Sequence, residues 1–145
     1  MNLGIDLDGT ALRFPEFFSK LTTNWSGRVY VLTARLCMQS AVDDCKENGI
    51  HYDEIILCSG FVDNHKSKEI ERLGIEVMFD DMPDFSVHFP KSCATFHVRN
   101  EDNFDFDTKH YLFTEDTGRI LGWRQDCFIP TVFPITSDAN GKKIG

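Results

Sequence analysis

Five short apolar runs, each separated from the next by a polar or amphipathic stretch, most constrain what this chain can fold into. The runs are residues 3–7, 28–32, 54–58, 75–79 and 94–98. Runs of this length that are rich in β-branched residues are typical of strands buried on both faces of a sheet. We therefore predict about five strands in one mainly parallel central sheet.

Helical patterns occupy stretches between these runs. In residues 36–48 the apolar side chains recur along one side, and Gly49 follows as a stop. Residues 66–73, which end before Gly74, and residues 83–89 predict two shorter helices. Strands that alternate with helices pair in parallel, and right-handed crossovers place helices on both faces of the sheet. The expected fold is a Rossmann-like, three-layer α/β fold.

The pattern changes after Arg99. Residues 100–107 are acidic and predict a loop, whereas residues 109–113 and 119–123 flank a turn at residues 116–118 and predict a β-hairpin. We interpret all 145 residues as a single domain. Its core is residues 1–99, and a C-terminal hairpin and tail form residues 100–145.

Charge, hydropathy and cysteine content narrow the classes of function. A net charge of −8 gives no broad electrostatic footprint for nucleic acid, which enters only as a substrate. No apolar run approaches the roughly 20 residues that span a bilayer, and the first residues lack the basic segment of a signal peptide. The five cysteines lack metal-site spacing, so we expect reduced, partly buried thiols. We expect a cytoplasmic protein without a membrane partner, and oligomerisation stays open.

Polar side chains lie at or just beyond the ends of four predicted strands. The set comprises four carboxylates, one hydroxyl and one ammonium: Asp6, Asp8, Asp80, Asp81, Thr33 and Lys66. Because the carboxyl ends of parallel strands form one ligand-binding edge, we expect these groups to converge. Two carboxylates about 4 Å apart repel by on the order of 4 kcal/mol at an effective dielectric of 20. Magnesium, which suits a few carboxylates plus a substrate phosphate, offsets this repulsion.

Each part of this set also has an ordinary structural interpretation. The Asp-x-Asp-Gly-Thr motif at residues 6–10 is compatible with a simple turn. It does not open an EF-hand, because Ala11 and Phe17 occupy the required glycine and glutamate positions. Thr33 alone is typical of a helix N-cap, Lys66 alone of a solvated charge, and the pair at residues 80–81 of a helix start. Their joint occurrence, in order and each with its own strand, favours a functional site.

The set resembles the haloacid dehalogenase superfamily of phosphohydrolases over roughly residues 1–98. The four motifs of that family stand here at residues 6–10, at residues 31–35 with Thr33, at Lys66 with Lys68 as the alternative, and at Asp80 and Asp81. The resemblance implies a Rossmann-like sheet, dependence on magnesium and hydrolysis of a phosphomonoester through an aspartyl phosphate.

The resemblance also implies a role for each residue. Asp6 is the nucleophile, and Asp8 gives a proton to the leaving oxygen and then takes one from water. The phosphate-binding residues are Gly9, Thr33, Ala34 and Lys66. The metal-binding residues are Asp6, Asp8 through its backbone carbonyl, Asp80 and Asp81, with Asp81 favoured as the direct ligand.

Members of this superfamily often carry an inserted cap domain. The segments between Thr10 and Arg28 and between Arg35 and Ile55 are too short for a domain of on the order of 50 residues. The resemblance therefore implies a capless core with an open cleft. A small phosphorylated metabolite or nucleotide is favoured as substrate, with a macromolecule such as a nucleic-acid 3′-phosphate end as the alternative. Transfer to an acceptor other than water and a non-catalytic binding protein also stay open.

Overall fold

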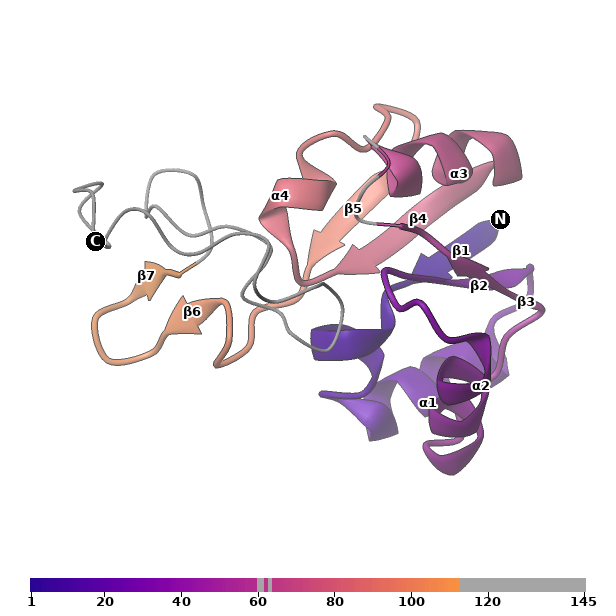
Figure 1. Ribbon diagram of the computed structural model, residues 1–145, viewed down its shortest axis with the longest axis horizontal. Helices are drawn as coiled ribbons and strands as arrows, with labels where there is room; N and C mark the ends of the chain where they lie inside the picture. Colours follow the sequence, from indigo (N-terminus) through magenta and orange to yellow (C-terminus); the bar gives the residue numbers. More distant parts are fainter. Residues whose placement is uncertain (60–61, 63, 113–145) are drawn as a thin grey trace.

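A five-stranded parallel sheet lies at the centre of the computed structural model, which describes residues 1–59, 62 and 64–112 (Figure 1). Its strands are β1 (Asn2–Ile5), β2 (Val29–Thr33), β3 (Glu54–Leu57), β4 (Ile75–Asp80) and β5 (Ala94–His97). Each strand overlaps one of the five predicted runs, and all four neighbouring pairs are parallel. The predicted α/β fold is therefore confirmed.

The strand order β3-β2-β1-β4-β5 reverses direction at β1. The chain moves outward from β1 through β2 to β3 and then returns to the other side of β1 with β4. In open sheets of this kind, ligands bind at the carboxyl ends of the strands where the order reverses. The pairing of Ile5 with Phe79 aligns the ends of β1 and β4 at that position.

Helices cover both faces of the sheet, with α1 and α2 on one side and α3 and α4 on the other (Figure 1). Their bounds are α1 (Pro15–Asn24), α2 (Met38–Glu47), α3 (His65–Leu73) and α4 (Pro83–Ser86). The last three lie within or next to the predicted helices, whereas α1 was not predicted. Within the described ranges, no helix has the length and apolar character needed to cross a bilayer.

Apolar side chains pack on both faces of the central strands. Ile5 and Phe18 belong to the core beneath α1 and α2, and Met78 and Ile70 belong to the core beneath α3. Gly4 makes room for the second core, because a Cβ there would lie 2.6 Å from the sulfur of Met78. The edge strand β5 differs, since all four of its residues are exposed. The expectation of burial on both faces therefore holds for the central strands and is wrong for β5.

The chain beyond β5 contains a short antiparallel pair rather than only a loop. Strands β6 (Phe104–Asp105) and β7 (His110–Tyr111) pair with each other, and the rings of Phe104 and Tyr111 lie 4.9 Å apart. The prediction of a loop over residues 100–107 is wrong at β6, because a two-residue strand in an acidic stretch leaves no periodic signal. An antiparallel hairpin is present, but most of the predicted one, residues 113–123, lies outside the described residues.

The cysteines of the described part are free thiols. Cys37 is exposed, whereas Cys45, Cys58 and Cys93 are buried. Burial raises the pKa of Cys45 to about 11 and that of Cys58 to about 12. The burial expected of the thiols is found for these three, while Cys37 differs and Cys127 lies outside the described residues.

Gly74 ends α3 in the left-handed conformation, with a φ of 61°. Among the described residues, a Cβ there would meet only Asn2 at 3.9 Å, an ordinary contact, so the resistance to a side chain comes from the backbone conformation. We expect Gly74→Ala to lower the free energy of unfolding in urea by about 1–2 kcal/mol. Gly74→Asn should cost less, because asparagine adopts this conformation more readily. Equal losses in the two variants would contradict this explanation.

Candidate active site and metal centre

Three buried aspartates meet at the carboxyl-terminal edge of the sheet. Asp6 follows β1, Asp80 ends β4, and Asp81 comes next. Their exposed fractions are 4%, 0% and 1%, and one carboxylate oxygen from each lies within 4.8 Å of the other two. The N–H of Asp6 donates to the carbonyl of Phe79 at 2.9 Å, which joins the two strand ends. The structure therefore brings these three predicted residues together.

Lys66 reaches this cluster from the first turn of α3. Its Nζ lies 2.9 Å from Oδ1 of Asp6 and 2.7 Å from Oδ2 of Asp80, and its side chain is buried. Burial by itself lowers the pKa of Lys66, but the charges and hydrogen bonds of both aspartates outweigh it and raise that pKa above its ordinary value. The ammonium is therefore charged, and it bridges the ends of β1 and β4.

Asp80 is held from two directions. Its Oδ2 accepts from Lys66, and its Oδ1 accepts from the backbone N–H of Met82 at 2.8 Å. Burial nevertheless raises the pKa of Asp80 to about 6, with Lys66 acting in the opposite direction and Asp6 adding to the rise. Asp80 is consequently ionised at neutral pH and protonated in moderate acid.

The turn over Leu7–Ala11 closes one side of the site. Gly9 has a φ of 78°, and a Cβ there would lie 2.1 Å from Oδ2 of Asp81. Glycine is needed here because the Asp81 carboxylate packs against its Cα, a reason separate from the predicted phosphate contact. The Thr10 hydroxyl lies 3.4 Å from Asp6 and 3.3 Å from Asp81, so its one proton is directed at either carboxylate.

The Asp8 carboxylate does not join the three buried aspartates. Arg35 holds it in a bidentate ion pair, with Nε 2.8 Å and a terminal guanidinium nitrogen 2.7 Å from its two oxygens. The other terminal nitrogen lies 2.6 Å from Asp44 and 3.3 Å from the Ser40 hydroxyl. The hydrogen bond to Asp8 raises the pKa of Arg35 above its ordinary value, against the lowering by burial. The Asp8 carboxylate is therefore oriented by Arg35, beside the cluster.

Thr33 and Ala34 lie at the end of β2, next to β1 in the sheet. The Thr33 side chain is fully buried, and its hydroxyl oxygen accepts the backbone N–H of Arg35 at 3.2 Å. Helix α2 begins at Met38, so Ala34 lies in the connection before it. The expectation that the Ala34 amide stands where a helix begins is wrong. Cys37 has an extended backbone, with a φ of −111° and a ψ of 112°, so the first helical turn starts only after it.

Among the described residues, the three buried carboxylates outnumber the one buried ammonium beside them. Like charges about 4 Å apart repel by on the order of 4 kcal/mol at an effective dielectric of 20. The buried oxygens of Asp6, Asp80 and Asp81 lie close enough to share one ion, and magnesium accepts such ligands together with water and phosphate oxygens. These residues therefore fit a divalent cation, and they are the candidates to hold it.

Sequence reasoning missed three polar side chains that the structure places around these aspartates. Arg35 orients Asp8, and Asn100 donates to an oxygen of Asp81 at 3.3 Å. Asn103 donates to the backbone carbonyl of Asp81 at 2.8 Å. A search for polar residues just beyond each predicted strand, extended to the fifth run, finds Asn100 by the same rule that finds Thr33.

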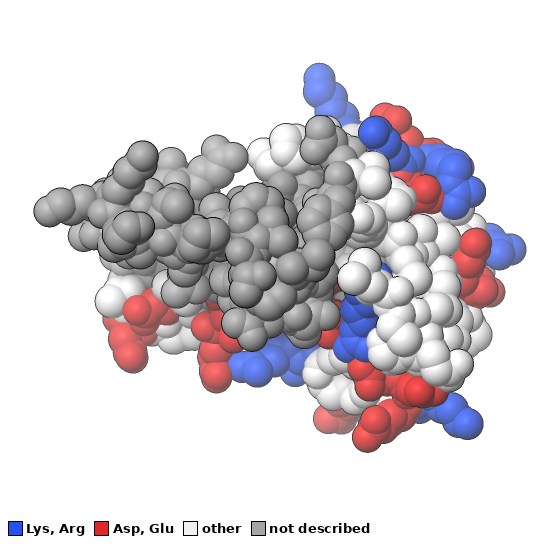
Figure 2. Space-filling model, in the orientation of Figure 1, with Lys and Arg blue, Asp and Glu red and all other residues white. Residues whose placement is uncertain are grey.

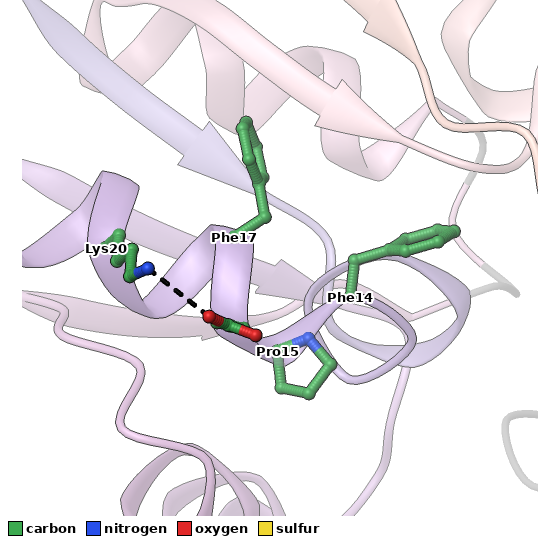
Figure 3. Close-up of a pocket in the computed structure, with 5 residues that line it drawn as sticks. Phe14, Pro15, Phe17 and Lys20 are labelled. Atoms are coloured by element: carbon green, nitrogen blue, oxygen red, sulfur yellow. Dashed lines mark hydrogen bonds and ion pairs between the residues drawn. The ribbon is translucent and has the colours of Figure 1, made fainter.

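Apart from the aspartate cluster, a hollow with a volume of about 550 Å³ lies at the start of α1 (Figure 3). It is lined by Phe14, Pro15, Glu16, Phe17 and Lys20. Lys20 forms an ion pair with Glu16 at 3.3 Å, so the charges of this hollow are matched within it. The backbone N–H of Phe14 donates to the carbonyl of Thr10, which makes the hollow a neighbour of the turn that carries Gly9.

No family model, curated protein or solved structure matches the chain. The function proposed below is therefore argued from the side chains and their geometry.

Asp80 predicts a pH dependence of definite sign for the candidate metal centre. Because its pKa is about 6, the carboxyl group holds a proton below that pH, and magnesium must displace this proton to bind. We expect the rise in melting temperature caused by MgCl₂ to be large at about pH 7.5 and to shrink as the pH falls through 6. Differential scanning fluorimetry with and without MgCl₂, over a series of pH values, measures this rise in melting temperature.

Without metal, the folded state binds more protons at Asp80 than the unfolded chain, whose pKa is the ordinary 3.8. The contribution of Asp80 to stability therefore falls as the pH rises from 3.8 to about 6. Asp80→Asn, which cannot titrate, should remove this fall. With metal, a magnesium-induced rise in melting temperature that is the same above and below pH 6 would contradict the assignment of Asp80 as a metal ligand.

Proposed function

We propose that this chain is a magnesium-dependent phosphohydrolase that forms a phospho-aspartate on Asp6, as in the haloacid dehalogenase superfamily that its motifs resemble. The observation that carries the proposal is the setting of Asp6. It is a buried carboxylate where the strand order reverses, with Lys66 at one oxygen and the Thr10 hydroxyl at the other. A carboxylate is already ionised at neutral pH and needs no activating base to act as a nucleophile.

The reaction proceeds in two displacements at phosphorus. A carboxylate oxygen of Asp6 forms a bond to phosphorus, while the bond from phosphorus to the leaving oxygen breaks and Asp8, in its protonated form, donates a proton to that oxygen and becomes the carboxylate that pairs with Arg35. Water then attacks the aspartyl phosphate, Asp8 takes a proton from the water, and phosphate leaves Asp6 as a free carboxylate. Lys66 neutralises charge on the transferring phosphoryl group. Magnesium, when bound, supplies further positive charge to the phosphoryl oxygens.

Two further groups support phosphate binding and proton transfer in this proposal. The Thr33 hydroxyl accepts the Arg35 N–H through its oxygen and can direct its own proton at a phosphate oxygen. The guanidinium of Arg35 fixes the orientation of Asp8, which acts as acid and then as base. Arg35 is thus a positioning residue for the proton transfer.

The favoured substrate is a small phosphomonoester. The net charge is −8, and among the described residues on the face seen in Figure 2 basic side chains stand beside acidic ones. Tight binding to a nucleic-acid backbone depends on clustered basic side chains. A screen should therefore begin with nucleotides and sugar phosphates, with 3′-phosphorylated oligonucleotides as the comparison.

Replacement of the nucleophile tests the proposal. We expect Asp6→Asn to lower magnesium-dependent phosphate release from an aryl phosphate by on the order of 10³-fold or more, because the attacking oxygen is lost. The matched control is Asp43→Asn, at an exposed aspartate of α2 that accepts a hydrogen bond from the Gln39 side chain. Near-normal turnover by Asp6→Asn, with the fold verified by circular dichroism, would refute the role of Asp6.

Removal of the Arg35 guanidinium tests the orientation of Asp8. Arg35→Ala should lower kcat by on the order of 10²-fold, the lower range of general acid–base catalysis, with little change in KM. The kcat of Arg35→Lys should lie between those of the wild type and Arg35→Ala, because lysine keeps the charge but cannot form the bidentate pair. Asp44→Asn removes the other ion pair of Arg35 and serves as the control. An Arg35→Ala variant that changes only KM, or only melting temperature, would be inconsistent with a positioning role.

A further inference from the structure

Two buried asparagines lie in the turn that follows β5. The side chains of Asn100 and Asn103 are almost completely buried, with residue exposures of 2% and 0%. The chain leaves β5 at the same edge of the sheet at which β4 ends (Figure 1). The two amides therefore lie within reach of the three aspartates, although they come from a part of the chain outside the motifs.

The turn itself fixes which way each amide points. Oδ1 of Asn100 accepts the backbone N–H groups of Asp102 and Asn103, at 2.8 and 3.1 Å. Oδ1 of Asn103 accepts the backbone N–H of Asn100 at 2.9 Å. A flipped amide would set its NH₂ group against these donors, so the observed orientation is the one the backbone permits. Both NH₂ groups consequently point away from the turn.

The NH₂ groups have different targets. The NH₂ group of Asn103 donates to two backbone carbonyls, that of Asp81 at 2.8 Å and that of Val98 at 2.7 Å. That of Asn100 donates to the carbonyl of Gly9 at 2.7 Å and to the carboxylate of Asp81 at 3.3 Å. Asn103 thus secures the chain, whereas Asn100 contacts a candidate metal ligand and the turn beside it.

Neutral donors suit a carboxylate that must bind a metal. Thr10 donates toward one oxygen of Asp81 and Asn100 toward the other, and neither donor carries a charge that would compete with a cation. Such hydrogen bonds from outside the ligand set orient a ligating carboxylate and tune its affinity. Gly9 adds the steric limit, since the Asp81 oxygen rests where a Cβ would lie.

We infer that Asn100 is a positioning residue for Asp81 and sets the affinity of the centre for magnesium. This inference rests on the proposed metal site. It gives the segment after β5 a role in the chemistry, because the amide of Asn100 holds the Asp81 carboxylate and the Gly9 turn in one arrangement. Asn103 supports that arrangement through the backbone alone.

Isothermal titration calorimetry of the full chain with MgCl₂ alone tests the inference by comparing two paired variants. Asn100→Ser and Asn103→Ser each keep a short oxygen that can accept the N–H groups of the turn, and each lose their NH₂ donors. We expect Asn100→Ser to raise the magnesium Kd by about 10-fold or more. Asn103→Ser should lower the melting temperature, while its Kd stays within about twofold of the wild-type value.

The possible outcomes separate the inference from the function proposed above. An unchanged Kd in Asn100→Ser, or equal weakening in both variants, overturns the inference and leaves the phosphohydrolase proposal standing. Absence of magnesium binding by the wild type overturns the metal site itself. If Asn100→Ser does not fold, Asn100→Thr likewise keeps a hydroxyl oxygen for the turn and removes the NH₂ donor, and it should also weaken magnesium binding. An unchanged Kd in a folded Asn100→Thr protein then overturns the inference.

Discussion

The ammonium of Lys66 between Asp6 and Asp80 is the interaction on which the rest of the site depends. It places one positive charge between two buried carboxylates that the ends of β1 and β4 bring together. Buried ion pairs of this kind contribute little net stability, because desolvation offsets much of the attraction. Three buried carboxylates beside one buried ammonium are therefore not explained by stability alone, and their excess negative charge supports the proposal that they hold a cation.

The arrangement of the strands explains why these charged side chains lie close together. Reversal of strand order at β1 sets Asp6 beside Asp80, and the turn at Gly9 brings Thr10 and Asp81 against them. Around this centre, Arg35 orients Asp8. Each supporting contact comes from a residue near the carboxyl end of a strand, so the same edge of the sheet supplies the proposed reacting groups and the groups that position them.

Sequence patterns predicted the sheet and the three central aspartates because both follow from local rules. Apolar runs mark strands, and polar residues that follow them mark the shared edge. The bidentate pair of Asp8 with Arg35 could not be predicted in this way, since it depends on the side-chain positions of two different strand ends. Helix α1 was also missed, because its apolar residues are sparse and partly exposed. The roles of the predicted residues in phosphate chemistry stay predictions.

Direct capture of the intermediate tests the central claim most sharply. Borohydride reduces an acyl phosphate on aspartate to the alcohol of homoserine, which peptide mass spectrometry locates to one residue. The account predicts homoserine at Asp6 after incubation with a phosphomonoester and magnesium, and none without magnesium or in Asp6→Asn. Turnover with no modification at Asp6, or modification of another carboxylate such as Asp8, would contradict it.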